Sequence, residues 1–166
     1  RTRTMRRLTE TAAIDTAPSF SPSGRHIVFV SGRSGTPQIY VMRANGRAQQ
    51  RISRGEGSYD EPLWSPRGDL IAFVKRLQGQ TYLGVMKPDG SQERLLTAAA
   101  GIGGLSWAPN GRALVFSRPR SGEQGGAELV VISLSGNGER VLETPHSATD
   151  PSWSAPLGAR QSVTRR

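Results

Sequence analysis

Pro62-Leu-Trp-Ser-Pro-Arg-Gly68 and Leu105-Ser-Trp-Ala-Pro-Asn-Gly111 are two copies of one pattern, which also stands earlier as Pro18-Ser-Phe-Ser-Pro-Ser-Gly24. A fourth copy begins at Pro151-Ser-Trp-Ser154. The aromatic residue at its centre recurs with spacings of 44, 43 and 46 residues, at Phe20, Trp64, Trp107 and Trp153. A second marker recurs with spacings of 44, 44 and 46, at Leu8-Thr9, Ile52-Ser53, Leu96-Thr97 and Leu142-Glu143. Two markers with one period indicate a repeat protein.

A period in the forties fits both β-propeller blades and solenoids of paired helices. The local pattern decides between them, because each repeat holds four short apolar runs separated by turn residues. In the second repeat these runs are 62–64, 71–74, 82–86 and 94–97. Ser65–Gly68 and Asp89-Gly90 carry the proline and glycine that tight turns require. The runs are rich in β-branched and aromatic residues and show no helical period, which predicts an all-β chain of four-stranded antiparallel, WD40-like propeller blades.

The repeats divide the chain into three full blades, near 18–53, 62–97 and 105–143, within a propeller region of 10–157. Arg6–Thr9, within a basic N-terminal segment of 1–9, is predicted to be the outer strand of a preceding blade. Pro151–Ser154 is predicted to be the inner strand of a closing blade, followed by a basic tail at 158–166. Three blades cannot close a ring that needs 4–8. We therefore expect either more chain before Arg1 or two copies that pair into a six-bladed ring.

Composition excludes several kinds of site. The chain has no cysteine, which excludes disulfides, zinc–thiolate sites and thiol nucleophiles. It has no run of 18 apolar residues, so we do not expect it to span a membrane. The net charge of +9 would suit nucleic-acid binding, but no groove-reading motif accompanies it. We expect solvated arginines and no nucleic-acid partner, and we expect the tryptophans to pack between blades rather than against a ligand.

No catalytic motif is present, which predicts that the chain is not an enzyme. His26 and His146 are the only histidines, and neither has a nucleophile at a recognisable spacing. There is no Gly-x-Ser-x-Gly nucleophile elbow. The glycines of 101–104 lack the strand and helix that flank a phosphate-binding loop. The alternative is the propeller of a prolyl oligopeptidase-like serine hydrolase whose catalytic domain lies outside these residues.

Several longer strings resemble the TolB family of propeller proteins, over roughly residues 5–157. They include Ile14–Gly24, Trp64–Phe73, Gly84–Gly90 and Asp150–Ser154. The short Trp-Ser-Pro-x-Gly motif is shared with other propellers, including those of prolyl oligopeptidases, whereas the longer strings are similar to the C-terminal half of TolB propellers. Two turns depart from the family pattern, since Ser23 and Asn110 stand where an aspartate usually precedes the glycine.

The resemblance implies a non-catalytic, protein-binding role in the periplasm. Members of this family belong to the Tol-Pal system of the cell envelope, which serves outer-membrane integrity, cell division and protein import. They bind the peptidoglycan-associated lipoprotein Pal, and they contact other Tol proteins through an N-terminal domain that has no counterpart in these residues.

The resemblance also places the segments that enter each first strand at the mouth of the central channel. It implies partner-binding residues at Asp15, Thr16, Ala17, Tyr59, Asp60, Glu61, Gly103, Thr149 and Asp150. The acidic residues among them would give this edge a negative field that steers a basic partner surface. Alternatively, they bond nearby backbone amides, as aspartate does in turns. A ring of carboxylates could hold Ca²⁺. Because ligands from three blades need not converge, we expect no cofactor and no metal.

Overall fold

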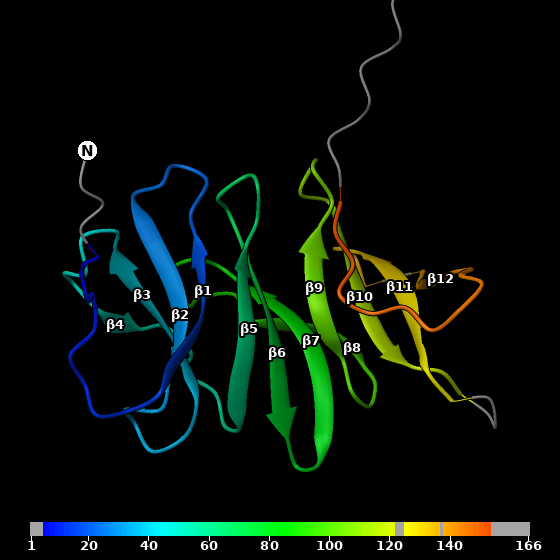
Figure 1. Ribbon diagram of the computed structural model, residues 1–166, viewed down its shortest axis with the longest axis horizontal. Coiled ribbons are helices and arrows are strands. Elements are labelled where there is room, and N and C mark those ends of the chain that lie inside the picture. The colour runs from blue at the N-terminus through cyan, green and yellow to red at the C-terminus, as the bar shows by residue number, and fades with distance from the viewer. Residues whose placement is uncertain (1–4, 122–124, 137, 154–166) are drawn as a thin grey trace, which may run out of the picture.

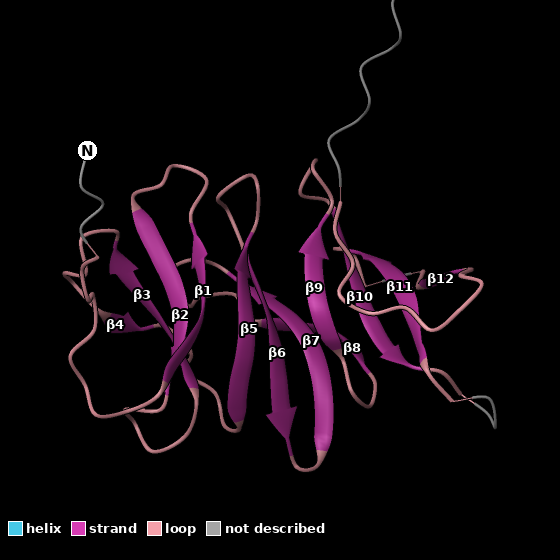
Figure 2. Ribbon diagram, viewed as in Figure 1, coloured by secondary structure: helices cyan, strands magenta, loops and turns pink. Residues whose placement is uncertain are grey.

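The computed structural model describes residues 5–121, 125–136 and 138–153, so the C-terminal tail at 158–166 lies outside the described residues. The described part contains twelve strands and no helix (Figure 2). They form three antiparallel sheets, each with its strands in chain order. The bounds are β1 Asp15–Phe20, β2 His26–Ser31, β3 Gln38–Arg43 and β4 Gln50–Arg51; β5 Ser58–Trp64, β6 Ile71–Leu77, β7 Gln80–Met86 and β8 Arg94–Ala98; β9 Gly103–Trp107, β10 Ala113–Pro119, β11 Ala127–Ser133 and β12 Arg140–Leu142. The three predicted blades are confirmed.

The blades stand face to face, and their first strands β1, β5 and β9 point the same way (Figure 1). Apolar side chains of facing sheets form one core at each junction. The first junction, between blades one and two, buries Val28, Ile39, Trp64 and Phe73. The second junction, between blades two and three, buries Val74, Leu83, Trp107 and Phe116, among others. No helix among the described residues is long and apolar enough to cross a membrane.

The tryptophans behave as predicted where a blade stands beside them. Trp64 is 9% exposed and Trp107 is 6% exposed, each within the core of a junction. Phe20 and Trp153, at the two ends of the arc, are 62% and 40% exposed. The same position of the repeat is therefore core or surface according to whether a neighbouring blade covers it.

Each first strand contains a bulge at the same position of the repeat. Two residues face a single phenylalanine of the second strand: Ala17 and Pro18 face Phe29, Glu61 and Pro62 face Phe73, and Gly104 and Leu105 face Phe116. The first residue of each pair is left-handed, with φ of 48°, 46° and 62°. A bulge leaves these residues outside the ladder, so the missing N–H of proline costs no strand hydrogen bond.

The bulges correct the boundaries predicted for the first strands. Asp15–Ala17, Tyr59–Glu61 and Gly103–Gly104 were expected to be loops, yet they form the beginnings of β1, β5 and β9. The predicted first runs began at residues 18, 62 and 105, whereas the strands begin two to four residues earlier, at Asp15, Ser58 and Gly103.

The two predicted end strands are not formed within the described residues. Neither 6–9 nor 151–153 is a strand, and Ser154 lies outside the described residues. No further strand stands beside either segment to complete a ladder, and a strand needs a paired neighbour. Leu8 nevertheless occupies its repeat position: a Cβ on Gly46 would lie 2.9 Å from the Leu8 carbonyl oxygen, as Gly90 faces Ile52 and Gly136 faces Leu96.

Each blade also holds one basic side chain against its outer hairpin. Arg33 donates to Gln49 over 2.5 Å, Lys75 to Glu93 over 2.8 Å, and Arg118 to Glu139 over 2.6 Å. The acceptors recur with the period of the repeat. Gln49 also donates to the Leu8 carbonyl over 3.0 Å, and Thr97 of the second blade donates to Glu139. These hydrogen-bonded pairs add polar contacts beside the apolar cores of the junctions.

Candidate functional site

The bulge residues form a continuous row along one edge of the blades. We use the name rim for this row together with the nine predicted site residues. Ala17 and Glu61 line one cleft of about 210 Å³, with Leu105 of the third blade. The Glu61 carboxylate lies close to β9, since a Cβ on Gly103 would lie 3.2 Å from its Oε1. A Cβ on Gly104 would lie 3.0 Å from the Cα of Asp150, which is left-handed like the bulge residues, with a φ of 50°. Residues 44 to 46 positions apart in sequence therefore lie side by side along this edge.

The surroundings of Glu61 shift its pKa. Burial raises its pKa above the ordinary 4.5, because a charged carboxylate is disfavoured away from water. The backbone N–H groups of Gly104 and Leu105 in blade three lower the pKa, but they do not outweigh burial. The Glu61 side chain of blade two therefore lies against the bulge of blade three.

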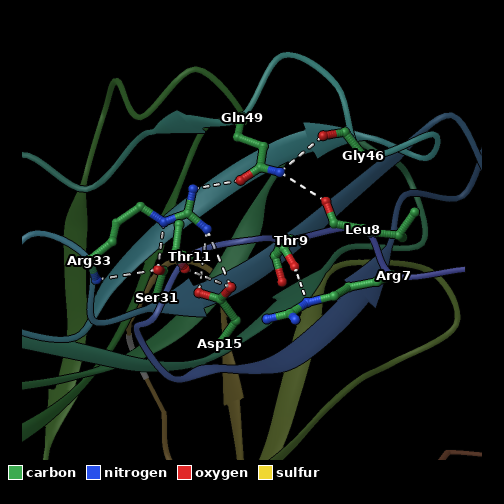
Figure 3. A network of polar contacts seen from close by, with 9 residues as sticks. All are labelled: Arg7, Leu8, Thr9, Thr11, Asp15, Ser31, Arg33, Gly46 and Gln49. Atoms are coloured by element: carbon green, nitrogen blue, oxygen red, sulfur yellow. Dashed lines mark hydrogen bonds and ion pairs between the residues drawn. The ribbon is translucent and has the colours of Figure 1, made fainter.

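Asp15 points into a polar network rather than toward a partner (Figure 3). Its carboxylate pairs with the Arg33 guanidinium at 3.4 Å and accepts a hydrogen bond from Thr11. Burial alone would raise the pKa of Asp15. Hydrogen bonds from Ser31, Thr9 and Arg33 outweigh it and hold the pKa below the ordinary 3.8. Its charge is neutralised locally.

Asp60 is also engaged. One of its oxygens accepts the backbone N–H of Glu61 over 2.9 Å, and the other pairs with Arg76 at 3.3 Å. The rim acids thus bond arginines and backbone amides, which supports the alternative weighed from the sequence. The negative field expected from Asp15 and Asp60 is largely matched by Arg33 and Arg76. Electrostatic steering of a basic partner is therefore a smaller effect than their number suggests.

Thr16 is exposed beside a largely apolar hollow, which sequence reasoning missed. This rim hollow, of about 420 Å³, is lined by Thr16 with Ala12, Ala13, Ile14, Val30 and Pro37. Ile14 is 78% exposed at its edge. The apolar run of Ala12-Ala13-Ile14 in a connecting segment was a signal that could have revealed it, because connecting segments are usually polar.

Of the remaining predicted site residues, some lie on the surface and others are partly or completely buried. Thr149 and Asp150 are exposed, and the Thr149 hydroxyl donates to the Asp150 carboxylate over 3.1 Å. Gly103 is half-buried, and its carbonyl accepts the Ser117 hydroxyl over 3.0 Å. Tyr59 is completely buried in the first junction, where its hydroxyl bonds Glu93 at 2.9 Å. Tyr59 therefore supports the rim from inside and presents no surface to a partner.

The described residues contain no cluster of three or more His, Asp or Glu side chains that could hold a metal ion. The rim carboxylates have separate partners: Asp15 pairs with Arg33, Asp60 with Arg76, and Asp150 with the Thr149 hydroxyl. His26 is stacked on Trp64 with ring centroids 6.3 Å apart, and the His146 carbonyl accepts a hydrogen bond from Arg120 over 3.1 Å.

The chain is similar to a known protein family and to several solved structures. The family model described as the TolB beta propeller domain matches residues 1–157. The structure is similar to TolB from Acinetobacter baumannii, at 26% identity and a TM-score of 0.79, over 89% of this chain and 37% of that one. It is similar to a putative TolB from Agrobacterium tumefaciens, at 22% identity and a TM-score of 0.66, over 81% of this chain and 50% of that one.

Propellers of enzymes share the architecture. Acylaminoacyl peptidase from Pyrococcus horikoshii matches at 15% identity and a TM-score of 0.61, over 78% of this chain and 25% of that one. At that identity the likeness shows a common fold alone. The chain spans half or less of the length of the three solved structures.

Proposed function

The chain belongs to the TolB beta propeller domain family, and on that premise we propose that it is a non-catalytic, protein-binding propeller segment of the Tol-Pal system. It acts in the periplasm, where its rim docks the lipoprotein Pal and so supports outer-membrane integrity and cell division. Other Tol proteins are contacted through parts of the parent that lie outside these residues.

One observation carries the proposal: the left-handed bulge residues of three blades and Asp150 stand in one row at one edge. Left-handed backbone at non-glycine residues is costly and persists only where the surroundings hold it. Ala17, Glu61 and Asp150 all adopt it, with φ between 46° and 50°. A rigid row of this kind presents fixed backbone groups to a partner, and binding to a rigid surface loses little conformational entropy.

The rim hollow supplies the apolar part of the docking surface. Exposed Ile14, together with Val30 and Pro37, lines a pocket for an apolar anchor of the partner. Central apolar anchors provide most of the energy in protein interfaces, with polar groups around them. The adjacent bulge row, with Glu61 and Asp150, supplies those polar surroundings.

Capture of the 166-residue chain by immobilised Pal tests the proposal. Thr16→Trp fills the rim hollow from an exposed position and should weaken capture about tenfold or more, because loss of an interface anchor costs at least about 1.4 kcal/mol. Asp60→Ala should weaken it less, since Asp60 is already paired with Arg76. Arg112→Trp is the control, because it places the same ring on an exposed turn away from the rim.

Circular dichroism and thermal melts should show that the three variants fold alike. Equal capture of wild type and Thr16→Trp would refute docking at the rim. Absence of capture for the wild-type chain, with Pal shown to be folded, would refute Pal binding by this segment.

A further inference from the structure

A second cleft lies along the outer strands of the first junction, away from the first strands that carry the rim. We call it the junction cleft; its volume is about 320 Å³. Blade one supplies His26, Arg43, Gln50 and Arg54, and the β7–β8 hairpin of blade two closes one side with Pro88 and Asp89. The volume is at the lower end of the range for small-molecule sites.

The sheet register explains why its cations converge. His26 on β2 is the direct partner of Arg43 on β3, and Val41 on β3 is the partner of Gln50 on β4. Directly paired residues point to the same face of a sheet. Arg54 follows β4 and lines the same cleft. Three basic side chains, from β2, β3 and the segment after β4, therefore face one space.

Charge pairing in the cleft is incomplete. Arg33, Arg76 and Arg118 each hold a carboxylate elsewhere in the described chain, whereas Asp89 is the only acid lining the junction cleft. One oxygen of Asp89 already accepts the backbone N–H and the hydroxyl of Ser91, over 2.9 and 2.6 Å. The cleft is thus lined by two arginines and a histidine against one acid that is engaged in its own turn.

The second junction shows how the same space can be filled. The residue at the repeat position of Gln50 is Arg94, whose guanidinium crosses to the Leu134 carbonyl of the next hairpin. The positions of His26 and Arg54 are taken there by Leu70 and Ala98. At the first junction the bridging arginine is absent, and the basic side chains stand around an open cleft instead.

We propose that the junction cleft binds the phosphate group of a sugar-sized phosphate monoester. Arginine forks and an imidazole offer N–H donors from three strands, and the three terminal oxygens of a phosphate accept from several directions. A phosphate monoester carries about −1.5 to −2 charges at neutral pH, which suits such a site better than a single carboxylate. Val41, Ile52 and Pro88 provide an apolar wall for the organic part, and the Gln50 amide can bond a hydroxyl. The proposal does not depend on Pal docking at the rim.

The test uses the 166-residue chain and follows amide chemical shifts by NMR during titration with glucose 6-phosphate, with glucose as the uncharged control. Saturable shifts at Val41 and Ile52 are expected with the ester and not with glucose. Arg43→Gln/Arg54→Gln should weaken binding roughly tenfold or more, as loss of charge-assisted hydrogen bonds does. Arg112→Gln/Arg140→Gln removes the same charge from exposed positions elsewhere and should leave binding unchanged.

Gln50→Arg separates a built site from general attraction of anions. By analogy with Arg94, the new guanidinium should cross to the Pro88 carbonyl and occupy the cleft. Binding of the ester should then fall although the net charge rises from +9 to about +10. Stronger binding by this variant, or equal losses in the two double variants, would overturn the proposal, as would the absence of saturable shifts.

The phosphate could belong to a free sugar phosphate or to a lipid headgroup. Flotation with phosphatidylcholine vesicles, with and without phosphatidic acid, distinguishes these sources. Flotation that requires phosphatidic acid and is lost in Arg43→Gln/Arg54→Gln identifies a lipid phosphate as a ligand of the cleft. Saturable binding of glucose 6-phosphate without flotation identifies the free ester. Flotation that the cleft variants leave unchanged, together with no binding of the ester, rejects the site.

Discussion

The first and second junctions share one pattern of apolar contacts but differ in their polar contacts. Both bury a tryptophan of the later blade in an apolar core. The Nε1 of Trp107 donates across the second junction to the Leu63 carbonyl over 3.0 Å, whereas the Nε1 of Trp64 donates to Gly68 of its own turn over 3.3 Å. The basic group is Lys75 at the first junction and Arg118 at the second. The repeat thus specifies the apolar contacts, and the polar edges differ.

This difference has a physical basis. An apolar core tolerates few changes because close packing penalises cavities and overlaps alike. Polar groups near the edge can exchange partners with water at little net cost. Blades can therefore share one architecture while their edges acquire separate properties, such as the open junction cleft on one side and the Arg94 bridge on the other.

The largest expected effect comes from removing a junction tryptophan. Trp107→Ala should destabilise the chain by about 3–5 kcal/mol, because it leaves a cavity between blades two and three and removes the hydrogen bond to the Leu63 carbonyl. Trp64→Ala should cost somewhat less, since its hydrogen bond stays within its own turn. Urea unfolding measures both. Equal losses would show that the cross-blade hydrogen bond adds nothing to the second junction.

Next in size is a steric contrast between equivalent hairpin glycines. Gly90 and Gly136 are both left-handed, with φ of 80° and 74°, so alanine costs each about 1 kcal/mol for its backbone. A Cβ on Gly90 would also overlap the Ile52 carbonyl, with the carbonyl carbon at 2.9 Å, whereas at Gly136 the nearest atom is the Leu96 oxygen at 3.5 Å.

Gly90→Ala should therefore cost about 3 kcal/mol and Gly136→Ala about 1 kcal/mol. Melting temperatures of the two variants measure the difference. Similar melting temperatures would mean that an added Cβ meets the same steric resistance at both hairpins.

Alkaline pH should weaken the first junction before the second. Burial alone would lower the pKa of Lys75, but hydrogen bonds to Glu93 and Tyr59 outweigh it and raise the pKa above 10.5. Burial also raises the pKa of Tyr59 above 10.0. Both groups thus keep their protons in the folded chain at a pH where the unfolded chain releases them. The stability that they contribute is present below about pH 10 and is lost as the pH rises through the folded-state values.

Arg118 stays charged throughout this range. Thermal melts between pH 8 and 11 should show a fall of about 1–2 kcal/mol, the scale of a hydrogen-bonded charged pair. Lys75→Met, which has neither charge nor titration, should flatten the curve, and Arg76→Met is the exposed control. An unchanged pH profile in Lys75→Met would assign the alkaline loss to other groups.

Much of the fold could be predicted from local patterns. The aromatic repeat and the glycine turns predicted the blades, because strand period and turn chemistry are short-range properties. The starts of β1, β5 and β9 could not be predicted, since the bulges at Ala17, Glu61 and Gly104 depend on pairing across the sheet. Residues 6–9 carry a strand sequence but have no ladder to join.

The rim could be predicted from the sequence only in part, for the same reason. Spacing placed Ala17, Glu61 and Asp150 at equivalent positions, and the structure brings the bulges into one row. It also buries Tyr59, which the family resemblance placed on the same edge. The pairing of Asp15 with Arg33, and of Asp60 with Arg76, joins residues 16 to 18 positions apart, and no motif announces it.

The smallest expected effect tests the ends of the arc. Phe20 occupies the repeat position of Trp64 and Trp107 but is 62% exposed. Phe20→Ser should therefore change stability by less than about 0.5 kcal/mol, as exposed substitutions do. If two copies pair through this face, Phe20 becomes core, the loss approaches that of Trp107→Ala, and the melting temperature of the wild type rises with protein concentration because association stabilises the folded state. Melting curves across a range of concentrations distinguish the two cases. A small effect that does not depend on protein concentration would agree with the structure, in which Phe20 is exposed while Trp64 and Trp107 are buried.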